Sequence, residues 1–486
     1  MMIAEKLSSL LQIDKSHRVT SWLFLRLLAI IYFIAFASLA VQINGLVGPD
    51  GILPFQEFLD NVYQRFGSDA YWRFPNIFWF NAGDLALHGA TFAGIVLSVS
   101  LFLGLYERLS LILMYVLYLS LTMAGQTFLT FQWDVLLLES GFLAIFLAAY
   151  PSLLVVFLLE WLLFRLRFLS GISKLLSGDP SWFSLKALDY YFETQPLPHI
   201  GSWYAHHLPE ILLRTGTGLT LFAEIIVPFF IFLPRPFRIV AAVITIILQL
   251  LIIATSNHNW INILTIVLCL FLLDDKIISR ILPKKLGEAI VQKTSGRKPG
   301  WGFALAMMGS VVFAASLVTM YDHLIGKNLP PRVFEMANVV RHYGLGHVYH
   351  VFPTMQTERQ ELEIQGSNDG REWKTYVFKY KPGPIDRAPV FNLPHQPRLD
   401  WLMWFVPPKF PDQLYWFDRF MRKLAQGEEK VTDLLETNPF RDKPPRYLRV
   451  LAYRYHFTTP KEHEETGFWW RRELLGEFPN TPARHP

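Results

Sequence analysis

The sequence predicts a polytopic α-helical membrane protein with about nine spans, followed by a β-rich soluble C-terminal domain. Of the 486 residues, 52% are hydrophobic and only 17% are charged, whereas an average soluble domain has about 25% charged residues. Long apolar runs fall between residues 20 and 320, while the C-terminal third is rich in charge, aromatic side chains and proline. We therefore expect a cytoplasmic N-terminal segment (1–19), a transmembrane helical domain (20–321) and a soluble domain (325–486).

A helix needs about 20 mostly apolar residues to cross a bilayer. Nine segments approach that length: 20–41, 85–104, 109–125, 133–150, 152–169, 211–233, 238–255, 260–273 and 301–321. The fourth and fifth are separated only at Tyr150 and Pro151, where proline permits a tight reversal. The first run is longer than the apolar core of a signal peptide, which favours an uncleaved span over cleavage after Ala40. Small residues at every fourth position of the second segment predict close packing against another helix; they are Ala86, Ala90, Gly94 and Ser98.

Basic residues predict the orientation, because loops rich in lysine and arginine stay in the cytoplasm. Residues 274–300 contain seven of them: Lys276, Arg280, Lys284, Lys285, Lys293, Arg297 and Lys298. Nine spans place this stretch, the basic N-terminus and Arg235 on the cytoplasmic side, and the C-terminal domain on the exoplasmic side. Four basic residues after the fifth span depart from this pattern: Arg165, Arg167, Lys174 and Lys186. Since loops account for much of the net charge of +5, we expect no nucleic-acid partner.

The C-terminal domain shows the period-two alternation of strands. Residues 361–365 alternate, Asn368-Asp369-Gly370 supplies a turn, and 373–380 returns as a second strand; residues 447–457 repeat the pattern, and 413–425 reads as a short amphipathic helix. An antiparallel sheet or sandwich is expected. The one cysteine, Cys269, lies in an apolar run, so an intrachain disulfide is excluded.

Several stretches, in order along nearly the whole chain, resemble the lipase maturation factor family. They include FQWDVLLLE at 131–139, GDPSW at 178–182, 187–190, 193–198, 262–275, 366–370, 378–383, PHQPRLDW at 394–401, 438–440 and 469–472. Tyr191, Pro198-His199 and residues 257–261 depart from the family pattern. The resemblance implies a factor of the endoplasmic reticulum membrane that helps secreted lipases to reach their folded, dimeric, active state. If the chain is bacterial, its location would be the inner membrane, and the resemblance does not identify its client.

A shorter stretch, Gly171-Ile172-Ser173-Lys174-Leu175 with Trp182 after it, resembles the membrane domain of vitamin K-dependent γ-carboxylases. That resemblance implies that Lys174 is a catalytic base acting on a lipid-soluble quinol-like substrate. The alternative is that Lys174 extends to the membrane interface and anchors the fifth span. We favour a non-enzymatic maturation role.

Carboxylates within the spans are the candidate intramembrane polar sites: Asp134, Glu139 and Glu224. A charge at the centre of a bilayer costs roughly 2.5–3.5 kcal/mol on insertion scales, so such residues face the bundle interior and find partners. We expect hydrogen bonds between helices, with Arg214 as a partner for Glu224. The alternative is that Glu139 binds a proton or a substrate group.

Two segments form the predicted working face toward a client protein. The first, residues 178–198, contributes Asp179, Trp182, Asp189, Glu193 and Gln195. The second, residues 394–401, contributes His395, Arg398, Asp400 and Trp401. Rigid prolines and large aromatic side chains suit a contact surface. The second segment could equally dock the soluble domain onto membrane headgroups.

Two groups of histidines, one formed by His199, His206 and His207 and the other by His342, His347 and His350, match no zinc-ligand spacing, so we expect no metal or other cofactor. No nucleophile triad, Walker loop or dinucleotide fingerprint appears. The lack of an inverted repeat argues against a transporter.

Overall fold

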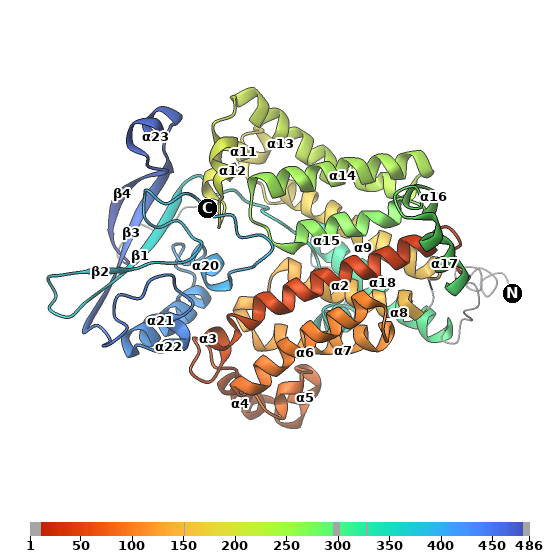
Figure 1. Cartoon of the computed structure of the whole chain (residues 1–486), viewed down its shortest axis with the longest axis horizontal. Coiled ribbons are helices and arrows are strands. Elements are labelled where there is room, and N and C mark those ends of the chain that lie inside the picture. Colours follow the sequence, from red (N-terminus) through yellow and green to blue (C-terminus); the bar gives the residue numbers. More distant parts are fainter. Residues whose placement is uncertain (1–10, 150, 295–301, 327–328, 480–486) are drawn as a thin grey trace.

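The computed structural model describes residues 11–149, 151–294, 302–326 and 329–479. A bundle of helices occupies one end and a small sheet the other (Figure 1). The long helices of the bundle are α2 (Arg18–Ala40), α6 (Asp84–Leu103), α7 (Glu107–Ala124), α8 (Gln132–Ala149), α9 (Leu153–Leu176), α13 (Glu210–Ile225), α14 (Arg235–Thr255) and α18 (Gly302–Ile325). Shorter helices connect or flank them: α3 (Ile43–Val47), α4 (Phe55–Phe66), α5 (Ala70–Arg73), α10 (Pro180–Phe183), α11 (Ala187–Thr194), α12 (Ile200–His206), α15 (Trp260–Leu268), α16 (Asp275–Ile278), α17 (Lys284–Thr294) and α19 (Pro331–His342).

Seven helical segments in the described ranges are long and apolar enough to cross a bilayer, and the chain is an integral membrane protein. They are Arg18–Ala40, Asp84–Leu103, Glu107–Ala124, Gln132–Ala149, Glu210–Phe232, Arg235–Thr255 and Ala304–Ile325. The other two predicted spans are helical but differ from these seven. Helix α9 carries four charged residues, and the apolar stretch Trp260–Leu272 is short. A count of nine spans therefore stays a prediction.

The small residues of α6 pack against α2. A Cβ atom at Gly94 would lie 2.4 Å from the ring of Phe36, so only glycine permits this approach of the two helices. Ser98 and Ala90 are buried on the same face. The stripe is thus a helix-packing surface, as the sequence predicts.

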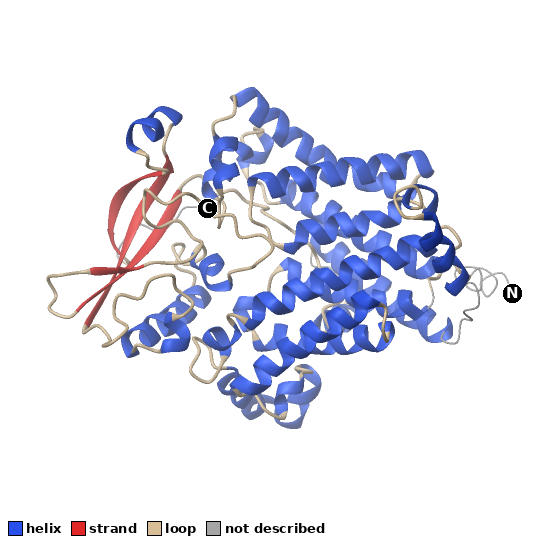
Figure 2. Cartoon of the chain, in the orientation of Figure 1, coloured by secondary structure: helices blue, strands red, loops and turns tan. Residues whose placement is uncertain are grey.

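The C-terminal domain contains one four-stranded antiparallel sheet among the described residues, with the order β2-β1-β3-β4 (Figure 2). The strands are β1 (Arg359–Ser367), β2 (Lys374–Tyr376), β3 (Tyr447–Phe457) and β4 (Trp470–Glu477). The helices of the domain are α20 (Arg398–Met403), α21 (Pro411–Gln426), α22 (Glu429–Thr432) and α23 (Pro460–Thr466). The predicted hairpin turn and the later strand are confirmed, and α21 is the predicted helix.

Two expectations for this domain are corrected. The returning strand ends at Tyr376, because Val377 leaves the hairpin and bridges to Thr437 instead. Helix α21 packs against β3, where a second sheet of a sandwich would lie. The domain contains a sheet but is as much helical as β.

After α18 the chain does not pass directly to the sheet. Helix α19 packs back on α18, and the irregular segment 343–355 then runs beside α9 toward the sheet. Its backbone contacts mark the path: the Glu139 carboxylate accepts from Gly346 N–H at 3.1 Å, Lys174 donates to the Val351 carbonyl, and Asp179 accepts from Met355 N–H. Non-helical backbone at membrane depth is tolerated where protein surrounds it, and here helices supply its hydrogen-bond partners.

The helical bundle and the C-terminal domain share one continuous hydrophobic core. Trp401 of α20 meets Trp133 of α8 edge to face, with ring centroids 5.0 Å apart. The start of α2, α16 and α17 lie at the end of the bundle opposite to the sheet (Figure 1).

Candidate functional site

Carboxylates inside the bundle are paired with basic side chains. Asp134 of α8 forms a bidentate ion pair with Arg398 of α20, with N–O distances of 2.6 and 2.7 Å, and accepts a third hydrogen bond from Tyr118. Both Asp134 and Arg398 are fully buried. Charge-assisted bidentate pairs are strong and directional, so this pair fixes α20 to the membrane helices.

Glu139 is the centre of a second pair. It binds Arg165 of α9 and accepts hydrogen bonds from Tyr349 and from the backbone of Gly346. Arg165 also donates to the carbonyl of His347. The contacts of Glu139 therefore join α8 to α9 and to the segment 343–355.

Glu224 of α13 pairs with Lys174 at 2.6 Å and with Arg167 at 3.3 Å, both on α9. The predicted pair of Glu224 with Arg214 is wrong. Arg214 pairs instead with Glu210, one turn earlier at the exposed start of α13. Arg214 is ten residues from Glu224 and lies near the helix end, whereas α9 crosses α13 beside Glu224: a Cβ atom at Gly171 would lie 2.7 Å from the Glu224 side chain.

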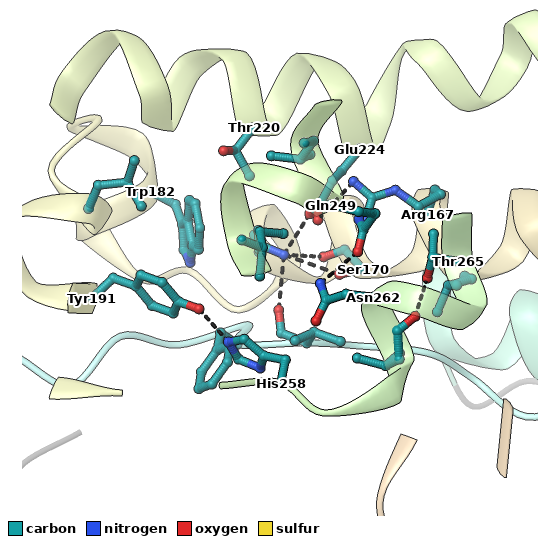
Figure 3. Close-up of a pocket in the computed structure, with 18 of the residues that line it drawn as sticks. Arg167, Ser170, Trp182, Tyr191, Thr220, Glu224, Gln249, His258, Asn262 and Thr265 are labelled. Atoms are coloured by element: carbon teal, nitrogen blue, oxygen red, sulfur yellow. Dashed lines mark hydrogen bonds and ion pairs between the residues drawn. The ribbon is translucent and has the colours of Figure 1, made fainter. Parts of the chain in front are cut away.

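A cavity of about 100 Å³ surrounds this ion pair, between α9, α13, α14, α15 and the segment 343–355 (Figure 3). Apolar side chains make most of the wall, and polar groups gather around the ion pair. On one side Gln249 accepts from the Asn262 amide at 2.7 Å. On another, the Tyr191 hydroxyl meets His258, and their rings are parallel within 3°. Trp182 closes a further side, with Lys174 Nζ 5.2 Å from its ring centroid.

Lys174 is buried, and its ammonium group has four acceptors: Glu224 Oε2, the carbonyls of Ser170 and Val351, and the Ser170 hydroxyl. An ammonium group offers three protons, so these acceptors use its whole donor capacity. These contacts hold Lys174 Nζ between α9, α13 and the segment 343–355. The geometry favours a structural role for Lys174 inside the protein, rather than an anchor at the membrane interface.

Most of the predicted working residues in 178–198 contact the rest of the protein. Trp182 is buried in the cavity wall, and Asp179 caps α10 and accepts from Met355. Glu193 bonds to His456 at 3.0 Å and to the backbone N–H of Phe457 in β3. Asp189 is partly exposed.

Gln195 is also buried. Its amide donates to the Thr255 carbonyl at the end of α14, and its own carbonyl accepts from Arg359 of β1 at 2.5 Å.

The second predicted segment, 394–401, lies between the two parts of the protein. Arg398, Asp400 and Trp401 are buried; Asp400 accepts from the backbone of Tyr380 and Lys381. His395 is half-buried and contacts Ser38 of α2. The segment therefore docks the domain onto the protein's own helices and not onto membrane headgroups.

Sequence reasoning missed Arg359. This fully buried side chain donates to the carbonyls of Glu193, Gln195 and Pro196, and pairs with Glu361, which also binds Lys381. It holds β1 on the end of α11 and the residues that follow it. Arg359 lies two residues before the predicted alternating stretch 361–365, and nothing in the sequence marked it. Tyr191 and His258, two positions that depart from the pattern of the resembled family, are in contact with each other.

The histidines have separate partners. His347 contacts the carbonyl of Arg341, His207 that of Trp203, and His350 stacks with His323. In the described part of the chain, no group of three His, Cys, Asp or Glu side chains is placed to hold a metal ion.

Comparison with known proteins gives consistent results along the chain. Residues 19–280 match the lipase maturation factor transmembrane domain, and residues 345–480 match the lipase maturation factor C-terminal domain. Lipase maturation factor 2 of Xenopus laevis is 33% identical, over 95% of this chain and 82% of that protein. The Homo sapiens protein of the same name is 31% identical over 95% and 82%. Lipase maturation factor 1 of Mus musculus is 32% identical over 95% and 87%. No solved structure matches significantly.

Proposed function

Because the chain belongs to the lipase maturation factor family, we propose that it is a membrane-integral maturation factor for an exported lipase or a similar client. The observation that carries this proposal is the match to both family domains, in order along the chain, together with relatives that are similar over 95% of the chain. The shared core and the buried Asp134–Arg398 pair support it, because they make the membrane helices and the C-terminal domain one unit that can present a rigid surface.

The proposed client side is exoplasmic. Helix α16 and the lysine-rich helix α17 lie at the end of the bundle opposite to the sheet (Figure 1), as expected if this end is cytoplasmic and the sheet is exoplasmic. Two of the basic residues that contradicted this orientation, Arg165 and Arg167, pair with Glu139 and Glu224 inside the bundle. They are not loop charges and do not count against the orientation. The membrane would be that of the endoplasmic reticulum in a eukaryote and the inner membrane in a bacterium.

The proposed contact surface is the accessible part of residues 178–198, since 394–401 is largely interior. Phe183 is 61% exposed at the end of α10. Lys186 precedes α11 and Asp189 lies in the first turn of that helix; both remain accessible. An exposed aromatic side chain beside charged groups suits a protein contact.

Co-expression tests the proposal. A secreted lipase is expressed in cells that lack their own lipase maturation factors, with or without this chain, and lipase activity per amount of secreted lipase is measured. We expect this chain to raise that activity. Phe183→Asp should reduce the gain, while Phe410→Asp, a change of a residue that is 59% exposed before α21, should preserve it. A lipase that gains nothing from the unaltered chain would contradict the function, and equal activity of both variants would contradict the surface.

A further inference from the structure

The cavity beside Lys174 contains polar groups that the protein itself leaves unpaired. Among the described residues, Trp182 Nε1, Arg167 Nε and Gln249 Nε2 are buried donors without a hydrogen-bond partner, and Asn262 Oδ1 is an acceptor without one. All four side chains line this one cavity (Figure 3). If the amides of Gln249 and Asn262 were both turned round, one donor and one acceptor would still remain.

Unpaired buried groups are unfavourable, and more so where hydrocarbon replaces water. Four of them around a single cavity indicate a polar group that occupies it. Donors outnumber acceptors, so that group presents acceptor atoms. The charged residues of the wall agree, because Arg167 and Lys174 supply two cations against the single carboxylate of Glu224. A ligand with an anionic headgroup would accept hydrogen bonds from these donors and would balance the excess positive charge.

The remaining wall is apolar and leads toward the bilayer. Leu166 and Ile261 line its buried part. On the outer side, Leu248 of α14 is partly exposed. The neighbours of these lining residues on α13 and α14 project outward, with Leu219, Ile247 and Leu251 between 52% and 60% exposed. Three lining residues of these helices, Thr220, Leu248 and Ile252, are themselves partly exposed, so the cavity opens toward the lipid-facing surface between α13 and α14.

The depth of the cavity also suits a lipid. Lys174 lies two residues before the end of α9, and Leu248 and Gln249 lie in the last two turns of α14, which ends at Thr255. The polar groups are therefore near the boundary of the membrane on the side of the sheet, at the level of lipid headgroups. We propose that this cavity binds the anionic headgroup of an amphipathic lipid, whose acyl chain leaves between α13 and α14. The headgroup could be the carboxylate of a fatty acid or the phosphate of a lysophospholipid, which share this chemistry.

Native mass spectrometry of the full chain in a neutral detergent tests this inference. Four probes with the same chain length are added separately: oleate, oleoyl-lysophosphatidate, methyl oleate and oleylamine. We expect one adduct with an anionic probe, and its mass distinguishes carboxylate from phosphate. Methyl oleate and oleylamine should bind at least about tenfold more weakly, because neither carries an anionic group that can accept a hydrogen bond from Arg167. Adducts of equal abundance with all four probes would overturn the proposal, and so would the absence of any adduct. Water alone would then satisfy the polar groups of the cavity.

Two pairs of variants locate the site. Leu248→Trp fills the opening without touching a charge and should lower binding at least about tenfold, whereas Leu250→Trp on the lipid-facing side of the same helix should bind as the unaltered chain does. Arg167→Met should weaken anionic probes only, and Arg214→Met, outside the cavity, should not. Should Arg167→Met fail to fold, the Leu248→Trp pair still decides the outcome. Undiminished binding by Leu248→Trp would refute this site.

Discussion

At the scale of single residues, buried ion pairs join segments that lie far apart in the sequence. Asp134 and Arg398 are separated by 264 positions, and removing one partner of a buried pair leaves the other charge uncompensated. We expect Arg398→Met to lower the stability by about 3–5 kcal/mol, measured by thermal unfolding in detergent. Arg422→Met, at an exposed pair with Asp418 on α21, should cost less than about 1 kcal/mol. Similar losses for both variants would show that the Asp134 pair is not the main attachment of α20.

The pair of Glu193 and His456 should make the contact between α11 and β3 sensitive to pH. Burial alone raises the pKa of Glu193, but hydrogen bonds from His456 and a backbone N–H lower it to below its ordinary value. The hydrogen bond to Glu193 raises the pKa of His456 above 6.5, although burial opposes it. The stabilisation from Glu193 is therefore lost as pH falls through its lowered pKa, and that from His456 is lost as pH rises through its raised pKa.

The pair is complete between the ordinary pKa values of 4.5 and 6.5. His456→Gln should therefore lower the melting temperature more at about pH 5.5 than at about pH 9. His206 also faces Glu193, and Arg454 and Arg471 face His456 and oppose its protonation. A melting-temperature difference that does not change with pH would contradict a charged pair.

Lys174 can be tested by removing one charge of its ion pair at a time. Lys174→Met leaves Glu224 paired with Arg167, so we expect this variant to stay folded in the membrane and to keep lipase maturation. Glu224→Gln leaves the buried cations Lys174 and Arg167 without a carboxylate, and it should lower the amount of folded protein more. A Lys174→Met variant that inserts stably but has no maturation activity would favour chemistry at Lys174.

At the scale of elements, the close approach of α2 and α6 depends on Gly94. Gly94→Leu would force side-chain atoms into the ring of Phe36 and should cost about 1–3 kcal/mol, seen as a lower melting temperature and yield. Gly89 lies on the same helix with no atom within 4 Å of an added Cβ, and Gly89→Leu is the matched control. Equal melting temperatures and yields of the two variants would mean that α2 and α6 can move apart without loss of stability.

The segment 331–355 is the element least visible in the sequence. Helix α19 and the irregular stretch after it have no long apolar run, and they read as the start of a soluble domain. In the structure they pack on α18 and α9, because helices supply the partners that irregular backbone needs inside a membrane. Val351, Phe352 and Met355 of this segment complete the wall of the cavity.

At the scale of the whole molecule, the proposed orientation makes the two ends chemically distinguishable. In a Cys269→Ala background, Lys285→Cys on α17 and Lys461→Cys on α23 each place one thiol at an exposed position. In intact cells or sealed vesicles of known orientation, a membrane-impermeant maleimide should label position 461 from the exoplasmic side and position 285 from the cytoplasmic side only. Labelling of both positions from one side would refute the orientation.

The sequence by itself determined the membrane helices, the family and the main strands, because apolar run length and period-two alternation are local properties of the chain. It also placed Asp134, Glu139 and Glu224 inside the bundle, since an isolated charge in hydrocarbon must find a partner. The tertiary structure alone decided which partners those were. In the structure Glu224 pairs with Lys174 and not with Arg214. Residues 394–401, predicted as a contact surface, form a largely interior contact between the C-terminal domain and the bundle. Trp182, Gln249 and Asn262 lie around one cavity. Those outcomes depend on which helices cross at which residue, and that is set by packing between segments that are distant in the sequence.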